Sequence, residues 1–443
     1  METLREQLGL TALRVGYTGS GGRGGRLTCE VRSPQEPVDA WEVPADAIGL
    51  LTGRPGADDD VEAELAWCRD RLARSAAVAR LRSHGEPLWL AVTPEHPVLP
   101  AVDWETGLAA LGLPVLRLPA RLGSPTASPH RPRVAVCVSA PRATGTVDAG
   151  TLVEGALAAM RAQPGPTPEV HLFADAGLTP PLRQLDGVTV HDPPVHDPAV
   201  APDDAPRTGD DREPAPTGRP WPDWISRTFD GSSLDVLHLI GHGALAADQG
   251  GFAVAERPDR DFDRGSARIL WPQQIATLMT STGAWGLVVT VTPRNYSSPG
   301  LRLLAARAAA MRSAATVVHE PERGGPPDQL EAAYRILLDH PTSPPPDTRG
   351  LTVTVHPGRF GVGEQDRANA YAPAPSDLGA LVDAGFAVPG WMVGARRQVA
   401  QWETQLSVDA DTEQARAARA GLEMAKERLD VVIRDALDPG GAP

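Results

Sequence analysis

Between residues 131 and 340, short apolar strands alternate with helical segments, and this pattern constrains the fold more than any other feature of the chain. Each strand is rich in Val, Leu or Ile and is bounded by polar residues, Gly or Pro. The strands are Val134 to Val138, Val170 to Phe173, Val236 to Ile240, Leu287 to Val291 and Thr316 to His319. Apolar strands connected by helices are typical of a largely parallel sheet covered on both faces. The sequence therefore predicts an α/β domain over residues 131–340.

The rest of the chain divides around this domain. Residues 1–50 alternate in the two-residue period of strands and form a β-rich segment, and residues 51–130 form an α/β extension. Inside the domain, residues 192–220 are crowded with Pro and Asp, which predicts a flexible insertion. Residues 341–390 are expected to be a linker that contains one short strand, whose position in the sheet the sequence does not predict. Residues 391–438 carry two amphipathic stripes that predict a helical hairpin.

Composition excludes several classes of partner. The 443 residues carry a formal net charge of -14, which repels phosphate backbones and anionic membrane surfaces. We therefore expect no nucleic-acid partner. We also expect no membrane association, because in addition no stretch of the sequence is long and apolar enough to span a bilayer. The three cysteines are far apart and lie in apolar segments, as reduced core thiols do. The start of the chain lacks a basic and then apolar leader, so the expected location is cytoplasmic.

Two motifs that suggest a cofactor or a metal are rejected. The stretch 19–25 contains the spacing GxGxxG, but a strand follows it where a dinucleotide site needs a helix, so we expect a hairpin turn and no cofactor. His238 and His242 have the spacing of a helical metal pair, but they lie across a strand and its turn. No nearby Cys or carboxylate pair completes a tetrahedral site, so we expect no metal.

The candidate site lies at the ends of two strands. His242 and Gly243 directly follow the strand that begins at Val236, which places an imidazole at the edge of the sheet where α/β enzymes keep their chemistry. A second buried strand, residues 286–291, ends at Thr292. Neighbouring strands lie about 5 Å apart, so these side chains are expected to meet if the strands are neighbours.

This pattern resembles the CHAT domains, caspase-like peptidase domains of bacterial conflict and signalling systems, over about residues 60–340. The resemblance is carried by the segment Leu237 to Gly243, by the element Ala101-Val-Asp-Trp104-Glu105, and by residues 286–291 with the helix and strand that follow. It implies a caspase-like, mostly parallel sheet with flanking helices. It also implies His242 as the base, the Gly243 amide as an oxyanion donor, and Thr292 at the position of the family's cysteine nucleophile. In the family, Trp104-Glu105 supports the fold; read on its own, it is a buried Trp followed by a helix-capping Glu.

Threonine at this position argues against catalysis. A thiol ionises near pH 8.5 and a histidine can hold it as a thiolate, whereas a hindered secondary alcohol must lose its proton during attack. Hydroxyl nucleophiles remain as an alternative, either Thr292 itself or Ser297 or Ser298 in the loop that follows. Cys137 lies in an apolar strand and is expected to be an inert core thiol.

The sequence thus favours a protein that is not an enzyme. The expected function is a degenerate caspase-like protein that serves as a regulatory or scaffolding subunit of a bacterial conflict or signalling system. Its expected partners are other proteins of that system, bound in part through the helices of residues 391–438. The alternative is an active endopeptidase that uses His242 with Thr292. A third possibility is a ligand-sensing module that binds without cutting.

Overall fold

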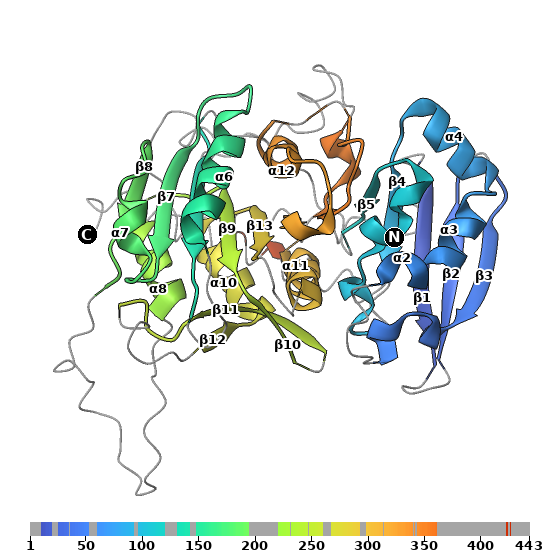
Figure 1. Ribbon diagram of the computed structural model, residues 1–443, viewed down its shortest axis with the longest axis horizontal. Helices are drawn as coiled ribbons and strands as arrows, with labels where there is room; N and C mark the ends of the chain where they lie inside the picture. The colour runs from blue at the N-terminus through green and yellow to red at the C-terminus, as the bar shows by residue number, and fades with distance from the viewer. Residues whose placement is uncertain are drawn as a thin grey trace, which may run out of the picture.

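The structure is a computed structural model, and one sheet of twelve strands runs through it (Figure 1). It describes residues 10–19, 25–34, 36–52, 60–92, 96–119, 131–141, 148–194, 220–230, 232–246, 248–259, 267–292, 298–312, 314–339, 341, 343–360, 422, 423 and 426. The strand order is β3-β2-β1-β4-β5-β15-β14-β13-β9-β6-β7-β8. The strands are β1 (Ala12–Thr18), β2 (Arg26–Arg32), β3 (Asp39–Pro44), β4 (Leu88–Val92), β5 (Val115–Arg117), β6 (Arg133–Val138), β7 (Glu169–Ala174), β8 (Val188–His191), β9 (Val236–Gly241), β13 (Gly286–Val291), β14 (Ala315–His319) and β15 (Leu351–Thr354).

The five strands predicted between residues 131 and 340 are β6, β7, β9, β13 and β14, and neighbours among them are parallel. Their alternate side chains enter two separate cores. One core packs against α6 (Ala149–Arg161) and α12 (Gln329–Leu338), and the other against α8 (Pro220–Thr228), α10 (Pro272–Thr282) and α11 (Ser298–Arg312). Helices cover both faces of these strands, and this arrangement confirms the predicted α/β class.

The N-terminal block has a core of its own (Figure 1, blue to cyan). β1 and β2 form the predicted hairpin across the glycine-rich stretch, with Thr18 opposite Arg26. The helical stretch after Asp60 is broken into α2 (Val61–Glu64), α3 (Ala66–Leu72) and α4 (Ala76–His84), because the backbone departs from the helical conformation at Leu65 and is extended at Ser75. The remaining short helices are α5 (Trp104–Leu108), α7 (Thr179–Leu182), η1 (Ala45–Ala47), η2 (Gly49–Thr52), η3 (Leu99–Ala101), η4 (Ala109–Leu111), η7 (Pro321–Arg323) and η8 (Pro357–Arg359).

The strand that the sequence left without a place, β15, joins the two blocks. It runs antiparallel to β14, with Leu351 opposite His319, and its last residue Thr354 is the register partner of Arg117 in β5. A buried hydrogen bond from the Val115 amide to the Thr348 hydroxyl, 3.1 Å long, adds to this joint. The predicted linker over residues 341–390 thus contains a strand in the middle of the sheet.

Helix α6 begins after an aspartate cap. Its N-cap is Asp148, whose carboxylate accepts a hydrogen bond from the Thr151 amide over 3.1 Å. Asp is among the preferred N-cap residues, and its charge also suits the positive end of the helix dipole. The expected insertion lies outside the described residues except at its margins, and the expected C-terminal hairpin does so except for residues 422, 423 and 426. No described helix is long and apolar enough to cross a membrane.

A second, three-stranded antiparallel sheet follows β9 directly. It consists of β10 (Gly243–Ala246), β11 (Gln249–Ala255) and β12 (Ala267–Leu270), in that order. α11 lies against this sheet so closely that two glycines are required. A Cβ on Gly250 would lie 2.0 Å from the Gly300 carbonyl oxygen and 2.7 Å from the Leu304 amide nitrogen.

This contact gives a test of packing. Gly250→Ala is expected to lower the free energy of unfolding by about 2 kcal/mol or more, because the helix must move away from the small sheet. Gly155→Ala, on the exposed side of α6 with no atom near the added Cβ, is the matched control and should raise it by about 0.5 to 1 kcal/mol. Urea unfolding of both variants measures the difference. Equal effects would contradict the close approach of α11.

Candidate functional site

The two residues that the sequence predicts to meet at the sheet edge lie in contact. β9 and β13 are parallel neighbours whose last residues, Gly241 and Val291, are register partners. The next residue of each strand, His242 and Thr292, therefore leaves the sheet beside the other. The imidazole Nδ1 of His242 lies 2.9 Å from the Thr292 hydroxyl oxygen, and the residues are 5 % and 2 % exposed. We call these two residues the His–Thr pair.

Thr292 is tied to the end of β9 through its backbone and its side chain. Its amide donates to the Gly241 carbonyl over 3.3 Å, and its hydroxyl oxygen lies 3.3 Å from the same carbonyl oxygen. A hydroxyl has one proton to donate. If the proton goes to Gly241, Nδ1 of His242 must be the donor of the 2.9 Å contact; if it goes to Nδ1, the imidazole accepts, as a general base must. The pair is thus hydrogen-bonded without substrate in either tautomer.

Backbone amides beside the pair determine whether an oxyanion can be stabilised. The Ala253 amide donates to the His242 carbonyl over 2.9 Å, and this bond shows which residues of β10 direct their backbone groups toward β11. Alternate residues of an antiparallel strand turn their amides away from the partner, so the Gly243 amide points away from β11. The Thr292 amide, in contrast, is used by Gly241. An oxyanion hole made from the nucleophile's own amide and a neighbouring one would lack one donor.

Access also weighs against attack by Thr292. A nucleophile must approach a substrate carbonyl to about 3 to 3.5 Å. The Thr292 hydroxyl is buried and both of its contacts are to β9 and the residue that follows it. In this conformation the hydroxyl completes the strand ends and is not presented to a substrate.

The sequence also named two serines and a cysteine near this site. Ser298 is the first residue of α11, and Ser297 lies outside the described residues. Cys137 is buried in the core between the sheet and α8, α10 and α11, where burial raises the pKa of its thiol far above the ordinary value. Cys29 and Cys68 are buried as well, and none of the three forms a disulfide. The expected core thiols are therefore confirmed.

His238 belongs to a buried polar chain that the sequence did not show. Its Nδ1 lies 2.7 Å from the Tyr334 hydroxyl and its Nε2 lies 2.8 Å from the Thr290 hydroxyl, which is in turn 3.4 Å from Nδ1 of His319. Burial lowers the pKa of His238 to about 3 and that of His319 to about 4. Both imidazoles are neutral at neutral pH. Among the described residues, no group of three or more His, Cys, Asp or Glu side chains is placed to hold a metal.

Two further polar residues at the sheet edge were missed. The Ser139 hydroxyl, after β6, donates to the Asp175 carboxylate, after β7, over 2.9 Å, and it accepts the Ala255 amide over 2.8 Å. The Ala140 amide donates to the same carboxylate over 2.8 Å. These bonds anchor the end of β11 to the large sheet. A lone Ser or Asp after an apolar strand gives no sequence signal that distinguishes an anchor from a loop residue.

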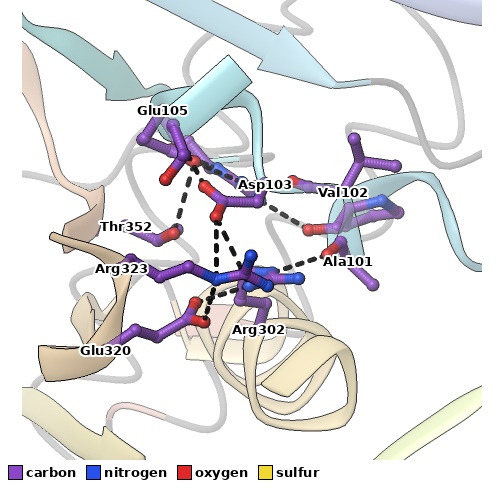
Figure 2. Close-up of polar contacts among 11 residues, drawn as sticks. Ala101, Val102, Asp103, Glu105, Arg302, Glu320, Arg323 and Thr352 are labelled. Atoms are coloured by element: carbon purple, nitrogen blue, oxygen red, sulfur yellow. Dashed lines mark hydrogen bonds and ion pairs between the residues drawn. The ribbon is translucent and has the colours of Figure 1, made fainter. Parts of the chain in front are cut away.

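Glu105 of the Trp104-Glu105 element is part of a buried cluster of charges (Figure 2). Glu105 was expected to cap a helix, but the cap of α5 is Asp103, whose carboxylate accepts the Thr106 amide. The carboxylate of Glu105 instead accepts two hydrogen bonds of 2.7 Å from Arg117 in β5 and one of 3.3 Å from the Thr352 hydroxyl in β15. Glu105 thus connects three elements of the joint between the blocks.

Arg302 of α11 occupies the other half of this cluster (Figure 2). Its guanidinium donates to the Ala101 carbonyl over 2.7 Å and to the Glu320 carboxylate over 2.6 Å. The second carboxylate oxygen of Asp103 lies 3.8 Å from Arg302 and 3.6 Å from Arg323. We call the residues Asp103, Glu105, Arg117, Arg302, Glu320 and Arg323 the buried charge cluster. It ties the N-terminal block to the helix that covers the His–Thr pair's strands.

Comparison with known proteins adds no family to this geometry. A search of protein-family models found no match, and no curated protein is detectably similar in sequence. What the site does must therefore be inferred from its residues.

The buried charge cluster predicts a large effect of one neutralising change. Glu105→Gln leaves Arg117 as a buried charge without its counterion and is expected to lower the free energy of unfolding by about 3 kcal/mol or more. Glu42→Gln breaks the exposed pair with Arg26 and should cost less than about 1 kcal/mol. Urea unfolding compares the two. A similar small loss in both would show that Glu105 is not essential to the joint.

The buried histidines predict that stability falls in mild acid. The pKa values of His238, His319 and His356 are lowered by burial, to about 3, 4 and 4, so the unfolded chain binds protons first as pH falls below about 6.5. Each should cost about 2 kcal/mol of stability between pH 7 and pH 5. Urea unfolding at several pH values measures the slope. His319→Asn should reduce it and the exposed-site control His84→Asn should not; equal slopes would refute the assignment.

Proposed function

We propose that this protein is a catalytically inactive, caspase-like protein that acts as a cytoplasmic regulatory or scaffolding subunit of a bacterial conflict or signalling system. The observation that carries the proposal is Thr292. It stands where a CHAT peptidase would have its cysteine, and its hydroxyl and amide are both used in hydrogen bonds to the end of β9. Such a residue stabilises the strand ends and does not attack a substrate.

The rest of the fold supports a binding function. The proposal is supported by the parallel sheet, by the strand that ends before His242 and by the small sheet after it, because a caspase-like peptide-binding domain requires all three. Loss of chemistry with retention of the fold is what a regulatory subunit requires, because binding depends on the surface and not on the nucleophile.

One observation favours a second function, an endopeptidase that uses a hydroxyl. The 2.9 Å contact between His242 and Thr292 has the length expected of a base and its nucleophile, and the Gly243 amide points away from β11. This alternative requires the Thr292 hydroxyl to become accessible and its amide to leave Gly241.

The proposal is tested with the purified protein and each protein encoded beside its gene. We expect stable complexes on size exclusion and no new fragments by mass spectrometry. His242→Ala and Thr292→Ala should form the same complexes, because neither residue is needed for a scaffold. Cleavage that disappears in both variants would overturn the proposal in favour of the peptidase.

Thr292→Cys serves as the matched control for the chemistry. It restores the family's nucleophile beside His242, and the native cysteines give little background because all three are buried. If Thr292 is buried as described, iodoacetamide should label Cys at this position slowly in the folded protein and rapidly in urea. Rapid labelling in the folded protein that His242→Ala suppresses would show an accessible, activated site instead.

A further inference from the structure

The strand that follows His242 is the edge of its sheet. β10 begins at Gly243 and pairs with β11 on one side only, since the order of the small sheet is β10-β11-β12. The His242 carbonyl accepts a hydrogen bond from the Ala253 amide. Within β10, the backbone amides and carbonyls of Ala244 and Ala246 therefore point toward β11. The amide and carbonyl groups of Gly243 and Leu245 therefore face outward, and no described residue pairs with them.

This edge is exposed and partly apolar. Leu245 is 37 % exposed, and among the described residues only Val38, at 55 %, joins it as an exposed large hydrophobic side chain. α11 lies on the face of the hairpin, where a Cβ on Gly300 would lie 2.3 Å from the Ala244 carbonyl oxygen and 3.1 Å from the Leu245 amide nitrogen. Leu245 and Ala246 are nevertheless exposed, and Figure 1 shows the β10–β11 hairpin projecting below α11. An edge strand with unpaired backbone groups is a template for another strand.

We propose that the outer edge of β10 binds an extended segment of a partner protein by strand addition, directly beside the His–Thr pair. Backbone hydrogen bonds to Gly243 and Leu245 give the affinity, and the side chain of Leu245 takes an apolar neighbour. The inference deepens the proposed function, on which it rests, by naming the surface and the kind of partner.

Charge narrows the kind of partner further. Asp248 is exposed at the turn that ends β10, and the whole chain has a formal net charge of -14. An acidic segment would be repelled, whereas a segment with Lys or Arg at the end nearest Asp248 would be attracted. The partner segment is therefore extended, apolar opposite Leu245 and basic at one end.

The test selects a library of short random peptides on the full-length protein, with counter-selection on Leu245→Pro. Proline removes the outward amide of residue 245 but none of the bonds from β10 to β11. The selected peptide should bind the wild type and lose about tenfold or more in affinity for Leu245→Pro. Val38→Asp, at the other exposed apolar residue, is the matched control and should leave affinity unchanged.

A second measurement needs no variant of the protein. Methylating the peptide amides one at a time should weaken binding to the wild type at every second residue, because only alternate amides face β10. No enrichment over the counter-selection, equal binding to Leu245→Pro, or an effect of methylation without this period would each overturn the strand addition. Cleavage of a bound peptide that His242→Ala abolishes would overturn the proposed function alone and leave the edge site standing.

Discussion

Three carboxylates and two arginines are buried where the two blocks of the sheet meet, with the partly exposed Arg323 beside them, and these charges must be paired. Backbone pairing between β5 and β15 is short, with a single register pair and one further bond from the Val355 amide to the Arg117 carbonyl. Isolated charges at this place would cost several kcal/mol each, so the buried charge cluster persists only because each carboxylate faces a guanidinium. The cluster acts together with the apolar core that Trp89 and Leu116 of the N-terminal block share with Leu351 and Val353 of β15.

The same cluster reaches the candidate site through α11. Arg302 is held by Glu320 and the Ala101 carbonyl, and two residues earlier Gly300 lies against β10. The position of this helix thus connects the N-terminal block with the strand that follows His242. If the edge of β10 binds a partner, its position therefore depends on the pairing of Arg302 with Glu320.

Local patterns explain how much the sequence predicted. The apolar strands predicted the α/β class. The contact of His242 with Thr292 was also predictable, because it requires only that the strands before these two residues be neighbours. β15 had no predicted place, because a four-residue alternating strand fits many sheets. The pairing of Glu105 with Arg117 and of Arg302 with Glu320 was not visible either, since charged residues are exposed by default and only the fold brings these together.

The central position of β15 has a consequence for how the chain folds. Val115 and Thr348 are 233 residues apart in sequence, yet their hydrogen bond lies at the joint of the sheet. Contacts of such sequence separation form late, because a long loop must first close. During synthesis the edge of β5 therefore has no β15 to pair with until residues 351–354 leave the ribosome, and an unpaired strand edge is a template for other strands.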